Sequence, residues 1–215
     1  MSSNGVFGLE HAIESVALPQ IEDSQKASIY VFKGRLARAM PELVEKLPLI
    51  KENTKSKKLL TPKLSFRFNP SDMKNYSSNN RMIETSNLFS INRLGITDSY
   101  ESGKSLTLGL DFKKEDINDS DKYLELNFGT VFRDSVEDKI PSSSTIDKKT
   151  SNLFGSIEYQ LSDIFAFNYN YSLDNDLKTV EYNNLSGKFS YKNFETELQF
   201  IEENGDIGDS NSILN

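Results

Sequence analysis

The chain has 215 residues, a formal net charge of −7 and a sequence pI of about 4.9. Its length predicts one domain or two small ones. The acidic balance argues against a nucleic-acid-binding protein, which needs a basic surface to neutralise phosphates. Cysteine is absent and His11 is the single histidine, so disulfides and thiolate metal sites are excluded and histidine-based catalytic triads nearly so.

The chain contains no apolar run of about 18 residues, the length that a transmembrane helix needs. Residues 1–20 lack the basic and apolar regions of a secretory signal, so the sequence as it stands predicts no signal peptide. Neither observation excludes a transmembrane β-barrel, whose strands alternate apolar and polar residues. With 11% aromatic residues, the chain also differs from a simple disordered sequence.

Residues 1–46 differ in pattern from the rest of the chain. Two sets of apolar residues in and beside this segment follow helical spacing: Leu9, Ile13, Val16 and Ala17, then Leu36, Met40, Leu43 and Leu47. We therefore predict short helical pieces here, with a short strand at 27–32. The predicted division is an N-terminal segment without an assigned family, 1–46, and a β-rich domain, 47–215.

From Leu59 onward the period of the apolar residues changes to two. Apolar and polar residues alternate over 64–68, 105–113, 124–133, 153–161, 165–174, 185–192 and 194–200, with a weaker strand predicted at 177–183. Short polar segments suited to turns lie between them at 162–163, 174–176, 183–184 and 192–193. We predict an all-β fold, an antiparallel meander of about eight strands.

The length of these predicted strands bears on their environment. Several have about nine to twelve residues, which is long for a soluble sheet and enough to cross a bilayer when tilted. The apolar face could pack on a second sheet in a soluble sandwich or face lipid in an outer-membrane barrel. Periodicity alone leaves both interpretations open, and strand length and aromatic content, including Tyr169 and Tyr171, favour the barrel.

Two patterns resemble ligand sites but lack essential residues. Gly103-Lys104-Ser105 ends like a phosphate-binding loop, but Asp98 stands where that motif needs its first glycine. The acidic segment 116–121 has Asp121 in place of the glycine of a calcium loop and is followed by Asn127 in place of its glutamate. A weak surface cation site is the most that this segment predicts. We therefore predict no enzyme activity, no cofactor and no metal site.

One stretch is specific enough to indicate a family. It combines an aromatic segment, an Asn-Arg-x-x-Gly element, an aspartate and a strand with a Gly-Leu pair, and it rests on Asn87, Phe89, Asn92, Arg93, Gly95, Asp98, Gly103 and Gly109. This pattern resembles the barrel domain of the LptD family, the lipopolysaccharide-assembly proteins of the outer membrane that are also described as organic solvent tolerance proteins. The resemblance covers about residues 47–208 and implies structural roles for these eight residues.

The resemblance implies transport rather than catalysis. Members of the family receive lipopolysaccharide from a periplasmic bridge of the LptA type, act with an LptE-type plug lipoprotein in the lumen, and release lipopolysaccharide into the outer leaflet. The expected partners are thus lipopolysaccharide, outer-membrane lipid and those two proteins, and the expected location is the cell outer membrane. Members are several times longer, so the resemblance implies a fragment of a larger, incomplete barrel. Ser99 stands where many members have arginine, and without cysteine the disulfides of many members cannot form.

In such a barrel the polar face lines the lumen and the apolar face meets lipid. The predicted lumen-facing residues are Ser105, Thr107, Asp111, Glu125, Asn127, Glu158, Asn168, Asn170, Lys188, Glu195 and Glu197. The predicted lipid-facing residues are Leu106, Leu108, Leu110, Leu126, Phe128, Phe165, Phe167, Phe189, Leu198 and Phe200. Two alternatives stay open: a segment of another outer-membrane barrel, such as a porin or an autotransporter, and a soluble β-rich binding module.

Overall fold

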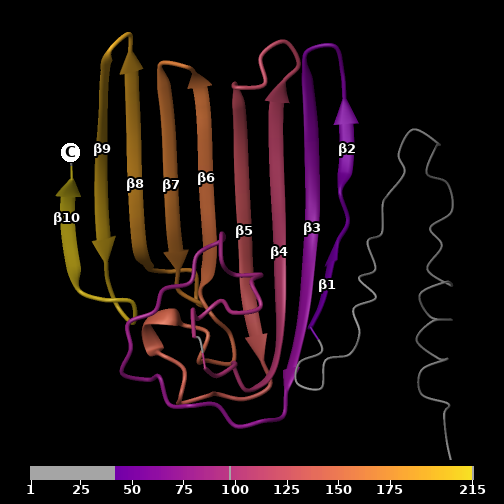
Figure 1. Ribbon diagram of the computed structural model, residues 1–215, viewed down its shortest axis with the longest axis vertical. Helices are drawn as coiled ribbons and strands as arrows, with labels where there is room; N and C mark the ends of the chain where they lie inside the picture. Colours follow the sequence, from indigo (N-terminus) through magenta and orange to yellow (C-terminus); the bar gives the residue numbers. More distant parts are fainter. Residues whose placement is uncertain (1–41, 97, 215) are drawn as a thin grey trace, which may run out of the picture.

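A computed structural model describes residues 42–96 and 98–214, which form a single antiparallel sheet. Its ten strands are β1 (Glu42–Lys46), β2 (Leu49–Glu52), β3 (Ser56–Asn69), β4 (Gly103–Asp116), β5 (Tyr123–Arg133), β6 (Leu153–Ser162), β7 (Phe165–Leu173), β8 (Val180–Tyr191), β9 (Phe194–Glu203) and β10 (Ser210–Leu214). From β3 to β10 each strand pairs with the next one in the chain (Figure 1). The predicted all-β meander is confirmed, with ten strands rather than about eight.

The first edge of the sheet is one strand in two pieces, because β1 and β2 both pair with β3 on either side of Pro48. Proline has no N–H to give to the ladder, so it interrupts the pairing. Leu47 still donates its N–H to the Pro62 carbonyl at 3.1 Å. The helix predicted over 36–47 is therefore wrong for Glu42–Lys46, which are extended. The other predicted elements of 1–46 lie outside the described residues, and the division at residue 46 stays a prediction.

The turn predicted at 183–184 is also wrong, because β8 continues through it. Asn183 opposes Tyr171 and Asn184 opposes Asn170 in the ladder with β7. The Tyr169 hydroxyl donates to Asn183 Oδ1 at 2.6 Å. These cross-strand partners outweigh the turn preference of asparagine.

Within the described residues, the sheet does not close on itself. The last strand, β10, pairs with β9 alone, and the first edge pairs with β3 alone. An open meander of long strands is what the predicted incomplete barrel requires. In the described part of the chain, no helix has the length and apolar character to cross a membrane.

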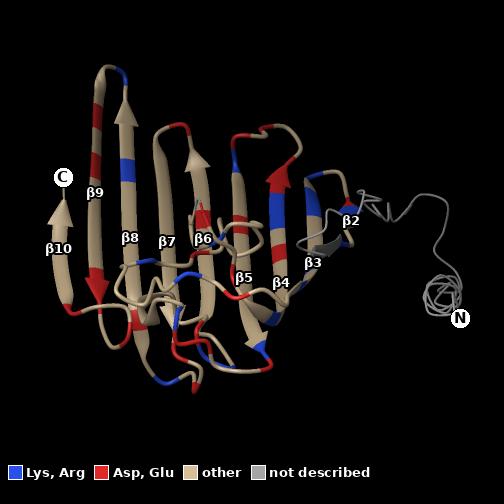
Figure 2. Ribbon diagram, turned by 60° about the horizontal axis from the view of Figure 1, so that its bottom comes forward, with Lys and Arg blue, Asp and Glu red and all other residues tan. Residues whose placement is uncertain are grey.

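The two ends of the sheet carry different connections (Figure 1). At the end that we call the short-turn end, the connections are 53–55, 117–122, 163–164 and 192–193. At the opposite, long-loop end, they are 70–102, 134–152, 174–179 and 204–209. The two longest fold back across one face of the sheet at this end, as Figures 1 and 2 show.

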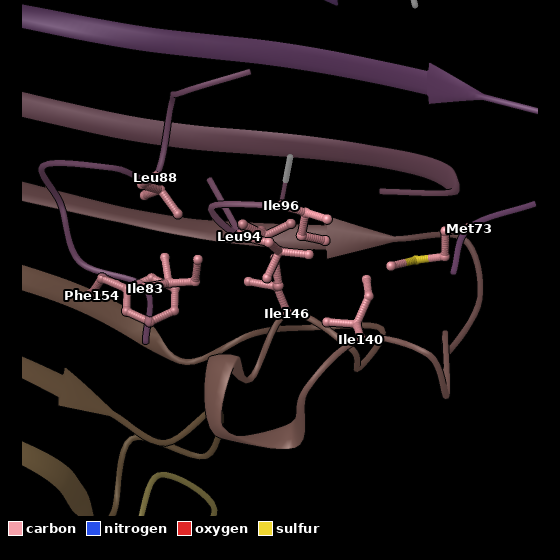
Figure 3. Close-up of a cluster of buried hydrophobic side chains, with 9 residues drawn as sticks. Met73, Ile83, Leu88, Leu94, Ile96, Ile140, Ile146 and Phe154 are labelled. Carbon is pink, nitrogen blue, oxygen red and sulfur yellow. The ribbon is translucent and has the colours of Figure 1, made fainter. Parts of the chain in front are cut away.

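The hydrophobic core lies between these two long loops and the sheet (Figure 3). Loop 70–102 contributes Met73, Ile83, Leu88, Leu94 and Ile96, loop 134–152 contributes Ile140 and Ile146, and the sheet contributes Val131 and Phe154. All nine side chains are at most 5% exposed. The core therefore belongs to the long-loop end and leaves most of the sheet uncovered.

Candidate functional site

The strand register sorts the side chains of the sheet onto two faces of opposite character. Residues directly opposite each other in antiparallel strands point to the same face, and alternate residues along a strand point to opposite faces. By this rule all eleven residues predicted to face the lumen share one face, which we call the polar face: Ser105, Thr107 and Asp111 on β4, Glu125 and Asn127 on β5, Glu158 on β6, Asn168 and Asn170 on β7, Lys188 on β8, and Glu195 and Glu197 on β9. The long loops lie over one end of it.

The ten residues predicted to face lipid share the opposite face, which we call the apolar face. Nothing among the described residues covers it: Leu108 is 39%, Phe189 41% and Leu198 58% exposed. Monomeric soluble proteins rarely expose apolar patches that extend over a whole sheet. This face therefore requires an apolar surrounding.

The open part of the polar face is a network of charged and amide side chains. Lys63 forms an ion pair with Asp111 across β3 and β4. Lys113 lies between two carboxylates, with its Nζ 2.9 Å from Glu115 and 3.9 Å from Glu125. The side chains of Lys113, Glu115 and Glu125 are each about one-third exposed, so water can reach them. Such groups can exchange partners with water or with a polar solute.

The network continues across the later strands with uncharged amides. Asn127 Nδ2 donates to Ser156 Oγ at 3.1 Å, between β5 and β6. Gln199 Nε2 donates to Asn184 Oδ1 at 2.8 Å, between β9 and β8. Further along, Lys188 and Glu195 form an exposed ion pair at 2.8 Å. The polar face thus offers donors and acceptors from β3 to β9.

A buried charge cluster, which consists of Glu101, Arg67, Arg93 and Arg133, fastens the loops to the polar face. Arg93 Nε donates to Glu101 Oε2 at 2.8 Å, and Arg67 Nη1 lies 3.4 Å from the same oxygen. Arg133 donates to the other carboxylate oxygen. None of the four side chains is more than 9% exposed. Burial raises the pKa of Glu101, but the three guanidinium groups, Arg93 foremost, lower that pKa to about 2.

Arg93 also joins this cluster to β4. Its Nη1 donates to Thr107 Oγ1 at 3.0 Å and its Nη2 to Ser105 Oγ at 3.2 Å. Ser105 is 4% exposed and Thr107 is fully buried. These two residues lie on the polar face, but beneath loop 70–102. A solute on the polar face would therefore meet the other nine predicted residues.

Three residues of the sequence motif form the turns of loop 70–102. The Asn87 side-chain oxygen Oδ1 accepts the Glu84 N–H at 3.0 Å. The Asn92 side chain accepts the Ile96 N–H at 2.8 Å, which closes the turn that holds Gly95. Gly95 has φ of 64°, a conformation that glycine adopts without strain.

Four more motif residues connect the loop to its surroundings. Phe89 lies against the backbone at Gly109. Asp98 accepts hydrogen bonds from Lys74 and Tyr76, and these bonds lower its pKa. Gly103 has φ of 85° and begins β4 beside the Arg133 guanidinium. At the departure noted above, the Ser99 hydroxyl accepts the Lys74 N–H at 3.0 Å.

Sequence reasoning found Arg93 but missed the rest of the charge cluster. Arg67 and Arg133 could have been noticed, because each is an arginine on the polar side of a strand close to its loop end. Nothing in the spacing could indicate that Glu101 joins them, since the four residues come from three separate stretches of the chain, β3, loop 70–102 and β5. The path of loop 70–102 brings Glu101 to the three arginines.

A sheet of long strands, apolar and exposed on one side, polar on the other and with loops folded onto the polar side, has the build of a wall segment of an outer-membrane β-barrel. A family model described as LptD: LPS transport system D matches residues 36–212. The chain belongs to the LptD family, which is described as a lipopolysaccharide transport system. The comparison with curated proteins found no match.

Proposed function

We propose that the chain forms part of the wall of the outer-membrane translocon that assembles lipopolysaccharide into the outer leaflet. The observation that carries this proposal is the register, which separates exposed leucine and phenylalanine side chains from the network of polar ones. A sugar and phosphate headgroup can move along a wet polar wall, while lipid surrounds the apolar face. Family membership supports lipopolysaccharide as the transported molecule.

The asymmetry of the connections supports an orientation. In outer-membrane barrels the periplasmic turns are short and the extracellular loops are long. The short-turn end, with turns such as 163–164 and 192–193, is then periplasmic. Loops 70–102 and 134–152 belong to the outer surface and narrow the lumen there.

The family also supports two protein partners for the complete translocon. By the resemblance noted above, we propose that these are a plug lipoprotein of the LptE type in the lumen and a periplasmic bridge of the LptA type that delivers lipopolysaccharide. In this proposal the plug contacts the open polar face, from Asp111 to Glu197, and residues 47–215 form the barrel-like part.

Adjacent positions on β7 test which face meets lipid. Because the chain has no cysteine, Phe167→Cys and Asn168→Cys each give a single site for a nitroxide label. In vesicles that contain the full chain, the Phe167 label should collide with oxygen and the Asn168 label with a water-soluble nickel complex. If both labels collide equally with oxygen and with the nickel complex, the proposal that this sheet is a barrel wall is contradicted. A Phe167 label that neither reagent reaches indicates a soluble sandwich instead.

Lipopolysaccharide contact is tested with a photo-crosslinking amino acid at Asn170 and, as a matched control, at Tyr171 on the other face. In growing cells, Asn170 should cross-link lipopolysaccharide, and the yield should depend on continued lipopolysaccharide synthesis. Cross-linking from Tyr171 alone would leave the chain as a membrane wall without a transport surface. This outcome would support another type of outer-membrane barrel.

A further inference from the structure

Three lysines form a row across neighbouring strands at the short-turn end. Lys51 on β2 is directly opposite Lys58 on β3, and Lys58 is directly opposite Lys114 on β4. All three side chains are exposed and lie on the apolar face, because Lys58 and Lys114 have the same parity as Leu60 and Phe112. Like charges directly opposite each other destabilise a sheet. We call these residues the lysine row.

The lysine row has little counter-charge on its own face of the sheet. Within residues 42–96 and 98–214, none of the three lysines forms an ion pair. Among the side chains of β2, β3 and β4, Asp116 is the only carboxylate on the apolar face. It lies one pair further out, opposite Ser56, and accepts the Asn118 N–H at 2.8 Å. Asp116 is thus one carboxylate near three lysines, and solvent or an external anion must offset the rest of the repulsion within the row.

The height of the row matches that of a bilayer surface. On β4, Lys104 and Lys114 are ten residues apart, and Leu106, Leu108, Leu110 and Phe112 occupy the apolar face between them. At about 3.3 Å per residue this is about 33 Å along the strand. With a tilt of about 40°, it becomes about 25 Å across the membrane, the height of the apolar band of a barrel. Lys114 and its neighbours thus lie at the level of lipid headgroups.

A hollow of about 930 Å³ adjoins the row. Its charged lining consists of three lysines, Lys55, Lys114 and Lys122, and two carboxylates, Glu115 and Asp116, and Leu124 and Tyr159 are among its other lining residues. By register, Leu124 lies opposite Lys114, and Tyr159 lies opposite Leu124, so these two apolar side chains share the face of the row. Ammonium groups and apolar side chains therefore meet in one depression, which suits a headgroup with acyl chains attached.

We propose that the lysine row and this hollow bind the phosphate of an anionic glycerophospholipid in the leaflet at the short-turn end. This proposal rests on the proposed function, which turns the apolar face to lipid. The acyl chains would lie along Leu60 and Phe112, below the row. Lysine side chains at a membrane surface attract the phosphate groups of anionic lipids, and this attraction weakens as the salt concentration increases.

The test measures which lipid lies beside the row. A bimane label on Leu124→Cys in the full chain reports quenching by spin-labelled phosphatidylglycerol or phosphatidylcholine in vesicles. We expect a preference of about fivefold for phosphatidylglycerol. The preference should fall to about one in K51Q/K58Q/K114Q and persist in K57Q/K149Q/K178Q, which removes the same charge from exposed lysines elsewhere. A label on Leu198→Cys, on the same face of β9, should show no preference.

The outcomes separate this proposal from the one on which it rests. If the Phe167 nitroxide reports lipid but the native chain shows no preference at Leu124, the lysine row does not bind phospholipid and the wall stands. An equal loss in both triple variants would overturn the proposal in the same way. If the Phe167 nitroxide reports water, both proposals fail. A stronger preference for lipid A than for phosphatidylglycerol, lost in K51Q/K58Q/K114Q, would overturn the assignment to a glycerophospholipid.

Discussion

Phe89 lies directly on the backbone of β4 at Gly109, where an added Cβ would come within 2.6 Å of the ring carbon Cζ. The residue opposite Gly109 on β5 is also a glycine, Gly129, and Leu88 fills the space above it. The consecutive side chains of Leu88 and Phe89 thus pack against the paired glycines of β5 and β4. Loop 70–102 is positioned by this absence of Cβ atoms as much as by its charges.

We predict that Gly109→Ala destabilises the protein by about 1–3 kcal/mol, because the new methyl group overpacks the site under Phe89. Gly187→Ala is the matched control, since a Cβ at this strand glycine meets nothing within 4 Å. Urea unfolding in bilayers would give both values. Similar losses for the two variants would mean that the ring does not rest on Gly109.

Glu101→Gln should cost about 3–5 kcal/mol, because it leaves three buried guanidinium groups without their carboxylate. Glu195→Gln removes an exposed carboxylate that pairs with Lys188, and should cost less than about 1 kcal/mol. The free energy of unfolding and the protease sensitivity of loop 70–102 would both be measured. A loop that stays protected in Glu101→Gln would contradict the anchoring role of the cluster.

The same carboxylate predicts a dependence of stability on pH. The pKa of Glu101 is lowered from 4.5 to about 2, so its ionised form favours the folded state. This stabilisation is complete above pH 4.5 and is lost as the pH falls toward 2, and it amounts to about 3 kcal/mol. The difference in unfolding free energy between the native chain and Glu101→Gln should shrink over that range. A constant difference from pH 6 to pH 2 would contradict the lowered pKa.

Arginine substitutions on the apolar face should depend on depth. Leu108 lies between the interfacial lysines Lys104 and Lys114, so Leu108→Arg should cost about 2–4 kcal/mol in a bilayer. Leu124, opposite Lys114, lies at the interface, and Leu124→Arg should cost about 0–1 kcal/mol. Unfolding in vesicles would compare them. Equal costs would indicate that this face packs on protein rather than on lipid.

Sequence periodicity predicted the division of the sheet into two faces, because a period of two leaves each strand one arrangement that keeps its apolar residues together. It failed at 183–184, where asparagines with strong turn preference are held in β8 by partners on β7. It also failed at Glu42–Lys46, which pair with β3 as an edge strand. Local preference cannot foresee either result, since pairing across strands decides both.

The contacts made by the loops could not be predicted from the sequence. The meeting of Glu101 with Arg67 and Arg133 depends on a loop path of more than thirty residues, and no spacing rule describes such a path. The residues of the family motif pointed to the correct loop but not to what it touches. The family motif thus includes Arg93, and the structure shows which residues Arg93 contacts.

The buried charge cluster also has a consequence for how the barrel wall is assembled. A slip of one residue in the pairing of β3 or β5 with β4 would move Arg67 or Arg133 to the lipid side. Glu101 would then be buried with fewer partners, and the misaligned arginine would enter hydrocarbon. Both unfavourable energies arise only in the misaligned sheet, so the contacts of loop 70–102 favour the correct register of β3, β4 and β5. A loop on the polar face can in this way select the correct strand pairing while the sheet assembles.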